Sequence, residues 1–125
     1  MKYFPVFLDA KKLAAMVIGG GEVATRKIEL LLKSTTNITI MSKNVCASVE
    51  RLMNLDRLTW LKHNDQAGHF THINLVIAAT DDMSVNKAIY QEATPLNILT
   101  NVVDQPELCT YITPAIIDRS PMIIA

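Results

Sequence analysis

Three of the four glycines in this chain are consecutive, at Gly19, Gly20 and Gly21. An apolar run, residues 15–18, comes directly before them and predicts a buried strand. Residues 22–33 follow with apolar side chains at helical spacing and predict an amphipathic helix. A glycine-rich turn between a strand and a helix is typical of sites that bind nucleotide phosphates.

The spacing of the small residues matches the pattern G-x-G-x-x-A. In this pattern Gly19 allows a tight turn, Gly21 lets a diphosphate approach the backbone, and Ala24 keeps the helix close to the strand. The backbone amides around Glu22 and Val23 are then expected to point at the phosphates, helped by the helix macrodipole. Any strand-to-helix turn can use glycine for structural reasons alone, but three glycines with a small residue at the last position favour phosphate binding.

Five short apolar runs with helical segments between them predict an α/β fold. The runs are mostly continuous rather than alternating, as expected for strands that are buried on both faces of a parallel sheet. The order of elements is that of a Rossmann-like, doubly wound, mainly parallel sheet. The predicted strands are residues 15–18, 38–41, 58–61, 74–79 and 97–103, with a final short strand at 122–125, and the predicted helices are residues 22–33, 45–53 and 84–94. Residues 63–72 predict a loop or a short helix.

Length and composition narrow the classes of protein to which the chain can belong. Its 125 residues contain no linker or low-complexity tract, so residues 1–125 are expected to form one domain. Twelve basic residues balance twelve acidic ones, which argues against a nucleic-acid partner. The apolar stretches are far shorter than the roughly twenty residues that cross a bilayer, so no membrane partner is expected. With only Cys46 and Cys109, a disulfide framework is excluded and a cytoplasmic location is expected.

The acidic residue that usually follows the second strand of this pattern is missing. It is expected about twenty residues after the glycine turn, where it binds the adenosine ribose hydroxyls. Here the strand ends at Met41 and is followed by Ser42, Lys43 and Asn44, so a hydroxyl, an amide or backbone groups would contact the ribose. Lys43 is compatible with a 2′-phosphate, which leaves the choice between NAD and NADP open. Its alternative role is that of an ordinary solvated loop charge.

Further acidic residues follow two other predicted strands. Asp104 comes after the fifth predicted strand, at the carboxyl edge of the sheet where ligands of open α/β sheets bind. Its alternative role is structural, because Asp-Gln-Pro-Glu is a good turn sequence. Asp81 and Asp82 are candidates for the N-cap of the third helix first, and for neighbours of a bound ribose second. The three histidines follow no structural-zinc spacing, so no metal site is predicted.

Four sequence blocks, in order along almost the whole chain, resemble one family. The glycine block alone is shared by many Rossmann proteins, whereas the last two blocks are more particular. Together the blocks resemble the N-terminal domain of siroheme synthases and the related stand-alone precorrin-2 dehydrogenases. They are Val-Ile-Gly-Gly-Gly-Glu-Val-Ala at 17–24 with Arg-Lys at 26–27, Ala-Ala-Thr-Asp-Asp at 78–82, Asn-Val-Val-Asp at 101–104, and Pro-Ala-Ile-Ile-Asp-Arg-Ser-Pro at 114–121.

The resemblance implies NAD-dependent oxidation of precorrin-2 to sirohydrochlorin, followed by insertion of ferrous iron, which is a substrate rather than a bound cofactor. Asp104 matches the aspartate that is thought to serve both steps in the family. A tetrapyrrole substrate carries many carboxylates, so Arg119 or Lys87 is a candidate for a cationic rim, with an ordinary surface charge as the alternative. The cofactor contacts that carry over are Gly19, Gly20, Gly21, Glu22, Val23, Lys43, Asn44, Ala79, Thr80 and Asp81.

Family members continue past the matching region into a helical segment that forms an interlocked homodimer and completes the substrate cleft. This chain stops at Ala125, so it is expected to be the NAD(P)-binding part, either of a longer protein or of a naturally short relative. Two other functions stay open. One is a module that binds NAD to sense redox state without turnover, and the other is a scaffold fragment that binds the cofactor weakly.

Overall fold

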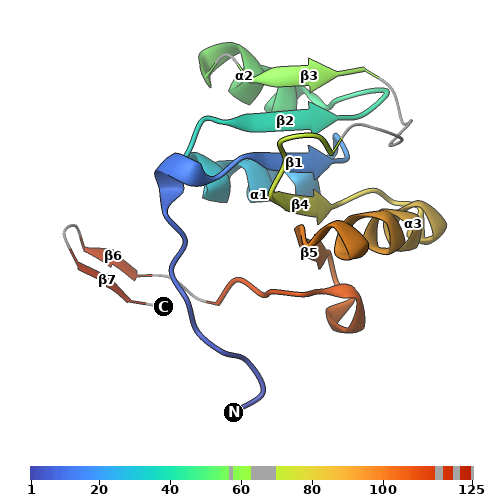
Figure 1. The fold of residues 1–125 in the computed structure, drawn as a ribbon. Helices are drawn as coiled ribbons and strands as arrows, with labels where there is room; N and C mark the ends of the chain where they lie inside the picture. Colours follow the sequence, from blue (N-terminus) through green and yellow to red (C-terminus); the bar gives the residue numbers. More distant parts are fainter. Residues whose placement is uncertain (57, 63–69, 115–116, 120–121, 125) are drawn as a thin grey trace.

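A five-stranded parallel sheet with the strand order β3-β2-β1-β4-β5 forms the centre of the molecule (Figure 1). The computed structural model describes residues 1–56, 58–62, 70–114, 117–119 and 122–124. This sheet confirms the predicted Rossmann-like α/β fold. Its strands are β1 (Ala15–Ile18), β2 (Ile38–Met41), β3 (Thr59–Leu61), β4 (Leu75–Ala78) and β5 (Leu99–Val102).

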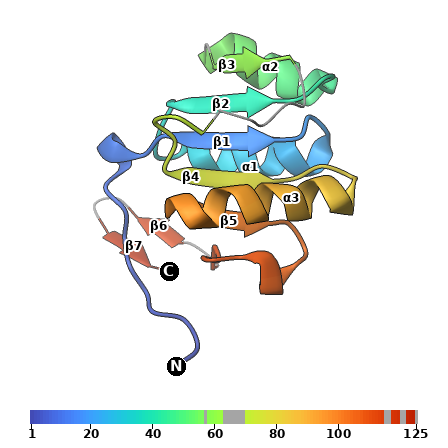
Figure 2. The same ribbon diagram turned by 45° about the vertical axis from the view of Figure 1, so that its right-hand side comes forward.

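Helices cover both faces of the sheet. They are α1 (Glu22–Leu32), α2 (Ala47–Asp56) and α3 (Met83–Ala93). Figures 1 and 2 show α1 and α2 on one face and α3 on the other. Alternate residues of β1 belong to two separate core clusters, with Ala15 and Val17 packed on the α1 side and Met16 and Ile18 on the α3 side. The strand is therefore apolar at every position, because each of its faces is buried.

Two segments differ from their predicted bounds by two residues or more at one end or at both, and the other predicted strands and helices by at most one residue at each end. The strand predicted at 97–103 begins at Leu99, because Asn97 has a φ of 60° and ends the 3₁₀ turn η2 (Thr94–Leu96). The helix predicted at 45–53 begins at Ala47 and extends to Asp56. The two residues before α2, Val45 and Cys46, therefore belong to the loop that follows β2 and not to the helix.

The predicted final strand is present, but it does not join the main sheet. It forms β7 (Met122–Ile124), which pairs antiparallel with β6 (Ile117–Arg119) in a separate two-stranded sheet. Of the polar connection predicted at 63–72, residues 63–69 lie outside the described residues, and residues 70–72 form a turn.

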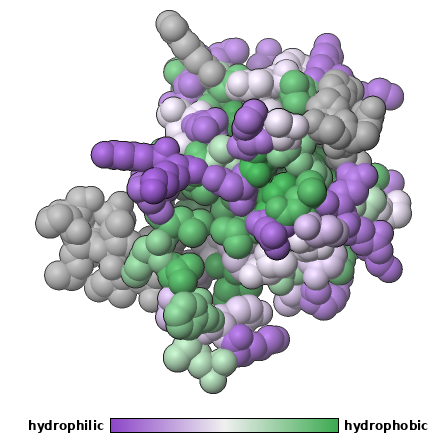
Figure 3. Space-filling model, in the orientation of Figure 1, coloured by the Kyte–Doolittle hydropathy of each residue, from purple (hydrophilic) through white to green (hydrophobic). Residues whose placement is uncertain are grey.

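The N-terminal segment runs outside the sheet and exposes apolar side chains, among them Phe4 at 86% and Phe7 at 74%. Figure 3 shows this apolar surface continuing down the segment toward the N-terminus. Within the described ranges, none of the helices has both the length and the apolar character that a membrane crossing requires.

Asp82 is the N-cap of α3. Its carboxylate accepts hydrogen bonds from the hydroxyl of Ser84 at 2.6 Å and from the amide of Ser84 at 3.0 Å. These bonds favour the ionised form and lower the pKa of Asp82. The cap therefore stabilises the start of the helix that borders the carboxyl end of β4.

Removing this cap should destabilise the fold in a pH-dependent way. Because the folded-state pKa of Asp82 is lowered, its contribution is present above the unfolded-state pKa of about 3.9 and is lost as the pH falls through the folded-state value. We expect Asp82→Ala to lower the free energy of unfolding at pH 7, and we expect the difference from wild type to shrink below about pH 4. Urea denaturation of wild type and Asp82→Ala, from pH 7 to below about pH 4, measures this difference in the free energy of unfolding. An equal difference at every pH would contradict the assigned cap.

Candidate functional site

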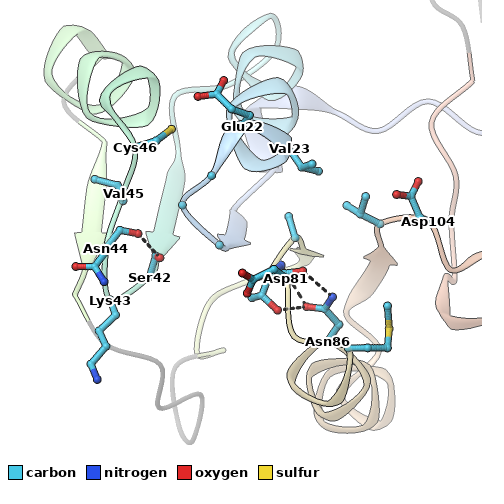
Figure 4. Close-up of a pocket in the computed structure, with 17 residues that line it drawn as sticks. Glu22, Val23, Ser42, Lys43, Asn44, Val45, Cys46, Asp81, Asn86 and Asp104 are labelled. Atoms are coloured by element: carbon cyan, nitrogen blue, oxygen red, sulfur yellow. Dashed lines mark hydrogen bonds between the residues drawn. The ribbon is translucent and has the colours of Figure 1, made fainter.

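A groove of about 840 Å³ lies at the carboxyl ends of β1 and β4 (Figure 4). These strands are neighbours, and the helices that follow them lie on opposite faces of the sheet (Figure 2). The groove therefore opens at the topological switch point, where open α/β sheets bind ligands. Its lining residues are Gly19, Gly20, Gly21, Glu22, Val23, Ser42, Lys43, Asn44, Val45, Cys46, Ala79, Thr80, Asp81, Met83, Asn86, Val103 and Asp104.

The first two glycines are required by close contacts of their backbone. Gly19 has a φ of 134°, and a Cβ there would collide with the carbonyl oxygen of Ala79 and lie 2.7 Å from its carbon. A Cβ on Gly20 would collide with the carbonyl oxygen of Asn44. The carbonyl of Gly20 also accepts a hydrogen bond from the Cys46 amide at 2.7 Å. Gly19 thus packs against the end of β4, and Gly20 packs against the segment after β2.

The third glycine has no such structural requirement. Among the described residues, no atom outside its chain neighbours lies within 4 Å of a Cβ built on Gly21. Gly21 is the N-cap of α1 and provides no side-chain hydrogen bond, so the first amides of the helix lack an acceptor within it. One turn further on, Ala24 is fully buried and lets α1 pack closely. A bare helix N-terminus therefore faces open space, as an anion-binding site requires.

The wall on the β2 side is held by β3. The amide of Ser42 donates to the carbonyl of Leu61 at 3.1 Å, and the indole of Trp60 donates to the carbonyl of Ser42 at 3.0 Å. The hydroxyl of Ser42 donates to the carbonyl of Asn44 at 2.6 Å. The loop that replaces the usual acidic residue is thus fixed by hydrogen bonds, while the Lys43 side chain is exposed.

The wall on the β4 side is built around Thr80. The side-chain amide of Asn86 bonds to the amide, hydroxyl and carbonyl of Thr80, and Asn86 is only 2% exposed. Asp81 follows and is exposed at the groove. Of the two cap candidates, Asp82 rather than Asp81 caps α3. This arrangement leaves the Asp81 carboxylate on the groove side of the turn (Figure 4).

Asp104 lies in the turn that follows β5. Its φ is 62°, in the left-handed region that aspartate tolerates better than most residues. The amide of Gln105 donates to the carbonyl of Val102 at 3.2 Å, and the thiol of Cys109 lies 3.2 Å from the carbonyl of Gln105. Burial raises the pKa of the Cys109 thiol, which keeps it protonated as a donor. Asp104 is therefore both the turn residue and the groove carboxylate that the sequence left as alternatives.

All of the predicted site residues except Ala24 line this one groove. Ala24 lies behind it, buried under the glycine turn. The fold thus brings together residues from four loops, and their binding roles remain predictions.

Sequence reasoning missed five of the lining residues: Val45, Cys46, Met83, Asn86 and Val103. Asn86 carried a usable signal, because it shares the buried face of α3 with Ile89 and Ala93. A polar residue on an apolar helix face needs a hydrogen-bonding partner, and here the partner is Thr80.

Of the other candidates, only Lys87 has a side chain that can be placed relative to the groove. Lys87 is exposed and does not line it. The side chain of Arg119, together with His63 and His69, lies outside the described residues. In the part of the chain that the structure describes, no three His, Cys, Asp or Glu side chains are grouped to hold a metal ion.

These features fit a dinucleotide. Gly21 leaves the space and the free amides that a diphosphate needs, and the fixed loop after β2 lies where a ribose binds in this fold. The fold and the groove together define a dinucleotide-binding domain of the Rossmann type.

Comparison with known proteins agrees with this class. The model of a family described as "Putative NAD(P)-binding" matches residues 6–115. Over all 125 residues the chain is 46% identical to a siroheme synthase of Pseudoalteromonas atlantica and 41% identical to siroheme synthase 1 of Serratia proteamaculans. The solved structure of SirC, a precorrin-2 dehydrogenase, matches with a TM-score of 0.83 at 25% identity. The chain therefore belongs to this NAD(P)-binding family, and within it to the type of the siroheme synthase N-terminal domain.

The matches differ in how much of each relative they cover. The chain spans 27% of the Pseudoalteromonas protein and 26% of the Serratia protein. The SirC match covers 98% of this chain and 60% of that one.

Alanine at Gly19 and at Gly21 should have opposite consequences for folding. We expect Gly19→Ala to lower the free energy of unfolding by about 2 kcal/mol or more, because the Cβ adds backbone strain and a collision with β4. Gly21→Ala should cost less than about 1 kcal/mol, because its Cβ enters open space and only the N-cap preference for glycine over alanine is lost. Chemical denaturation of the two variants compares them directly. Equal destabilisation would show that Gly21 is also a structural glycine.

Proposed function

We propose that this chain provides the NAD-dependent oxidation of precorrin-2 to sirohydrochlorin. The observation that supports it is the open groove at the β1–β4 switch point, where Gly21, which faces open space, and the Asp104 carboxylate line the same groove. Similarity to siroheme synthases and to a precorrin-2 dehydrogenase supports the proposal that the substrate is a carboxylated tetrapyrrole.

The glycine turn and the N-terminus of α1 would hold the diphosphate of the cofactor. The backbone at Gly21, Glu22 and Val23 provides amides that have no acceptor among the described residues, together with the positive end of a helix dipole. Ser42 and Asn44 border the position of the adenosine ribose. When bound, NAD supplies a hydride acceptor, and the chain's own part is to hold it and to exclude other orientations.

NAD, rather than NADP, is the cofactor that we propose. Lys43 is the only cation among the described residues that line the groove, and the hydroxyl of Ser42 is already bonded to Asn44. A 2′-phosphate is usually bound by a planar arginine fork, which this wall does not offer.

Asp104 would act as the base of the oxidation. Aromatising the reduced macrocycle removes a hydride and a proton, so a base must lie within hydrogen-bond reach of the carbon–hydrogen or nitrogen–hydrogen bond that loses the proton. Asp104 is exposed on the side of the groove formed by β5 and is held by the turn bonds at Val102 and Gln105. Insertion of ferrous iron, as a substrate, also releases protons from pyrrole nitrogens, and we extend the proposal to that step.

Replacing Asp104 should separate catalysis from cofactor binding. We expect Asp104→Asn to lower precorrin-2 oxidation at least about 100-fold, because it removes a general base. Its affinity for NAD should stay near that of wild type, because the glycine turn is untouched. Absorbance assays with precorrin-2 and calorimetric titration with NAD measure the two effects.

Gly21→Ala provides the matched control, with a folded chain and NAD binding weakened about tenfold or more. Full oxidation by Asp104→Asn would reject the base. Tight NAD binding without any turnover by the wild-type chain would instead support a redox-sensing module. Preference for NADP would contradict the assignment of the cofactor.

A further inference from the structure

Asn86 is one of three polar side chains that are buried in the described part of the chain, with Thr25 and Thr100. It lies in the first turn of α3, on the face that packs against the sheet with Ile89 and Ala93. Burying a primary amide is costly unless its donors and acceptor find partners. The hydrogen-bonding partners of the Asn86 side chain therefore indicate its structural role.

Among the described residues, the Asn86 side chain forms hydrogen bonds with a single partner, Thr80, and the dashed lines at Asn86 in Figure 4 mark them. Its Oδ1 accepts from the Thr80 hydroxyl at 2.6 Å and from the Thr80 amide at 3.2 Å. Its Nδ2 donates to the Thr80 carbonyl at 3.1 Å. The side-chain amide of Asn86 thus forms hydrogen bonds with the backbone N–H, the backbone carbonyl and the hydroxyl of Thr80. These bonds fix the peptide planes on both sides of Thr80.

Thr80 is in turn the neighbour of the glycine turn. A Cβ on Gly19 would lie 3.3 Å from the Thr80 nitrogen, and the amide of Ala79 donates to the carbonyl of Ile18 at 2.8 Å. The loop from Ala79 to Asp81 is thus held between the end of β1 and Asn86. Any rotation of the Thr80 peptides would move this loop into the groove or away from the glycine turn.

We propose that Asn86 is the positioning residue for the half of the dinucleotide that extends from the glycine turn toward β4. In this fold the adenosine ribose lies at the end of β2 and the diphosphate at the first glycine turn, so the remaining nucleoside crosses to the β4 side. Asn86 acts on that side of the groove through Thr80, because its side-chain oxygen and nitrogen are both bonded to Thr80. The inference rests on the proposed cofactor site and adds a residue that fixes its shape.

The test compares NAD with ADP, which lacks the second nucleoside. Asn86→Leu keeps a branched side chain but has no polar atom, and Asn86→Ala removes the side chain. We expect both variants to bind NAD about tenfold or more weakly, because misplacement of a positioning group is costly. ADP affinity should stay within about twofold of wild type, because the diphosphate and β2 side are unchanged. Calorimetric titration measures both ligands.

Ser84→Ala is the matched control, because Ser84 lies in the same helical turn, bonds to Asp82 and does not line the groove. It should weaken neither ligand. Hydrogen exchange gives a readout that needs no ligand: the Thr80 amide should exchange slowly in the wild type and in Ser84→Ala, and faster in the Asn86 variants. Fast exchange of this amide in the wild type would overturn the proposal.

The titrations also separate a failure of the positioning role of Asn86 from a failure of the cofactor site. Equal loss of NAD and ADP affinity in the Asn86 variants, or no loss of either, would reject the positioning role while leaving the proposed function intact. A wild-type chain that binds neither NAD nor ADP would reject the cofactor site itself.

Discussion

The close approach of the Gly19 backbone to the Ala79 carbonyl is the contact on which the rest of the groove depends. It is possible only because Gly19 has no Cβ and a φ of 134°. The contact continues the parallel pairing of β1 and β4 one residue past the strands, while α1 and α3 leave toward opposite faces of the sheet (Figure 2). The groove is the space that this divergence creates. Gly20 repeats the close contact on the other side, against Asn44, so the turn is fixed from two directions and Gly21 alone is left facing open space.

Hydrogen bonds from neighbouring elements also fix the loops on the two sides of the groove. On the β2 side Trp60 and Leu61 hold Ser42 through its carbonyl and its amide, and on the β4 side Asn86 holds Thr80. These hydrogen bonds act on backbone groups of the loops after β2 and β4, and their partners come from β3 and α3. The loops are therefore preorganised by the sheet and by α3, so a ligand does not have to order them on binding.

The sequence predicted the sheet, the three helices and the glycine turn because these depend on local periodicity and spacing. Residues 15–18 were correct as a strand to the residue, since both faces of β1 are buried and every side chain is apolar. The start of β5 and the pairing of β7 were not predictable in the same way. The first depends on the left-handed conformation of Asn97, and the second on a partner, β6, that local pattern does not specify.

The residues of the candidate site also separate into those that local sequence pattern predicts and those that depend on tertiary contacts. Residues next to predicted strand ends were found, since parallel strands place their carboxyl ends at one edge. Asn86 and Cys46 were missed, because their place at the groove depends on tertiary contacts with Thr80 and with Gly20 and Thr25. The two interpretations of Asp104 do not exclude each other: it lies in a turn after β5 and also lines the switch-point groove, while its catalytic role stays a prediction.

The proposed function depends on the amides at the start of α1, which have no acceptor among the described residues and which we propose bind the diphosphate of NAD. The most direct measurement is an NMR titration of the ¹⁵N-labelled chain with NAD, following each backbone amide. If NAD binds there, saturation should shift the amide resonances of Gly21, Glu22 and Val23 most strongly, together with those of the loops at Ser42 and Thr80. Saturable binding that leaves the amides of residues 21–23 unchanged would contradict it.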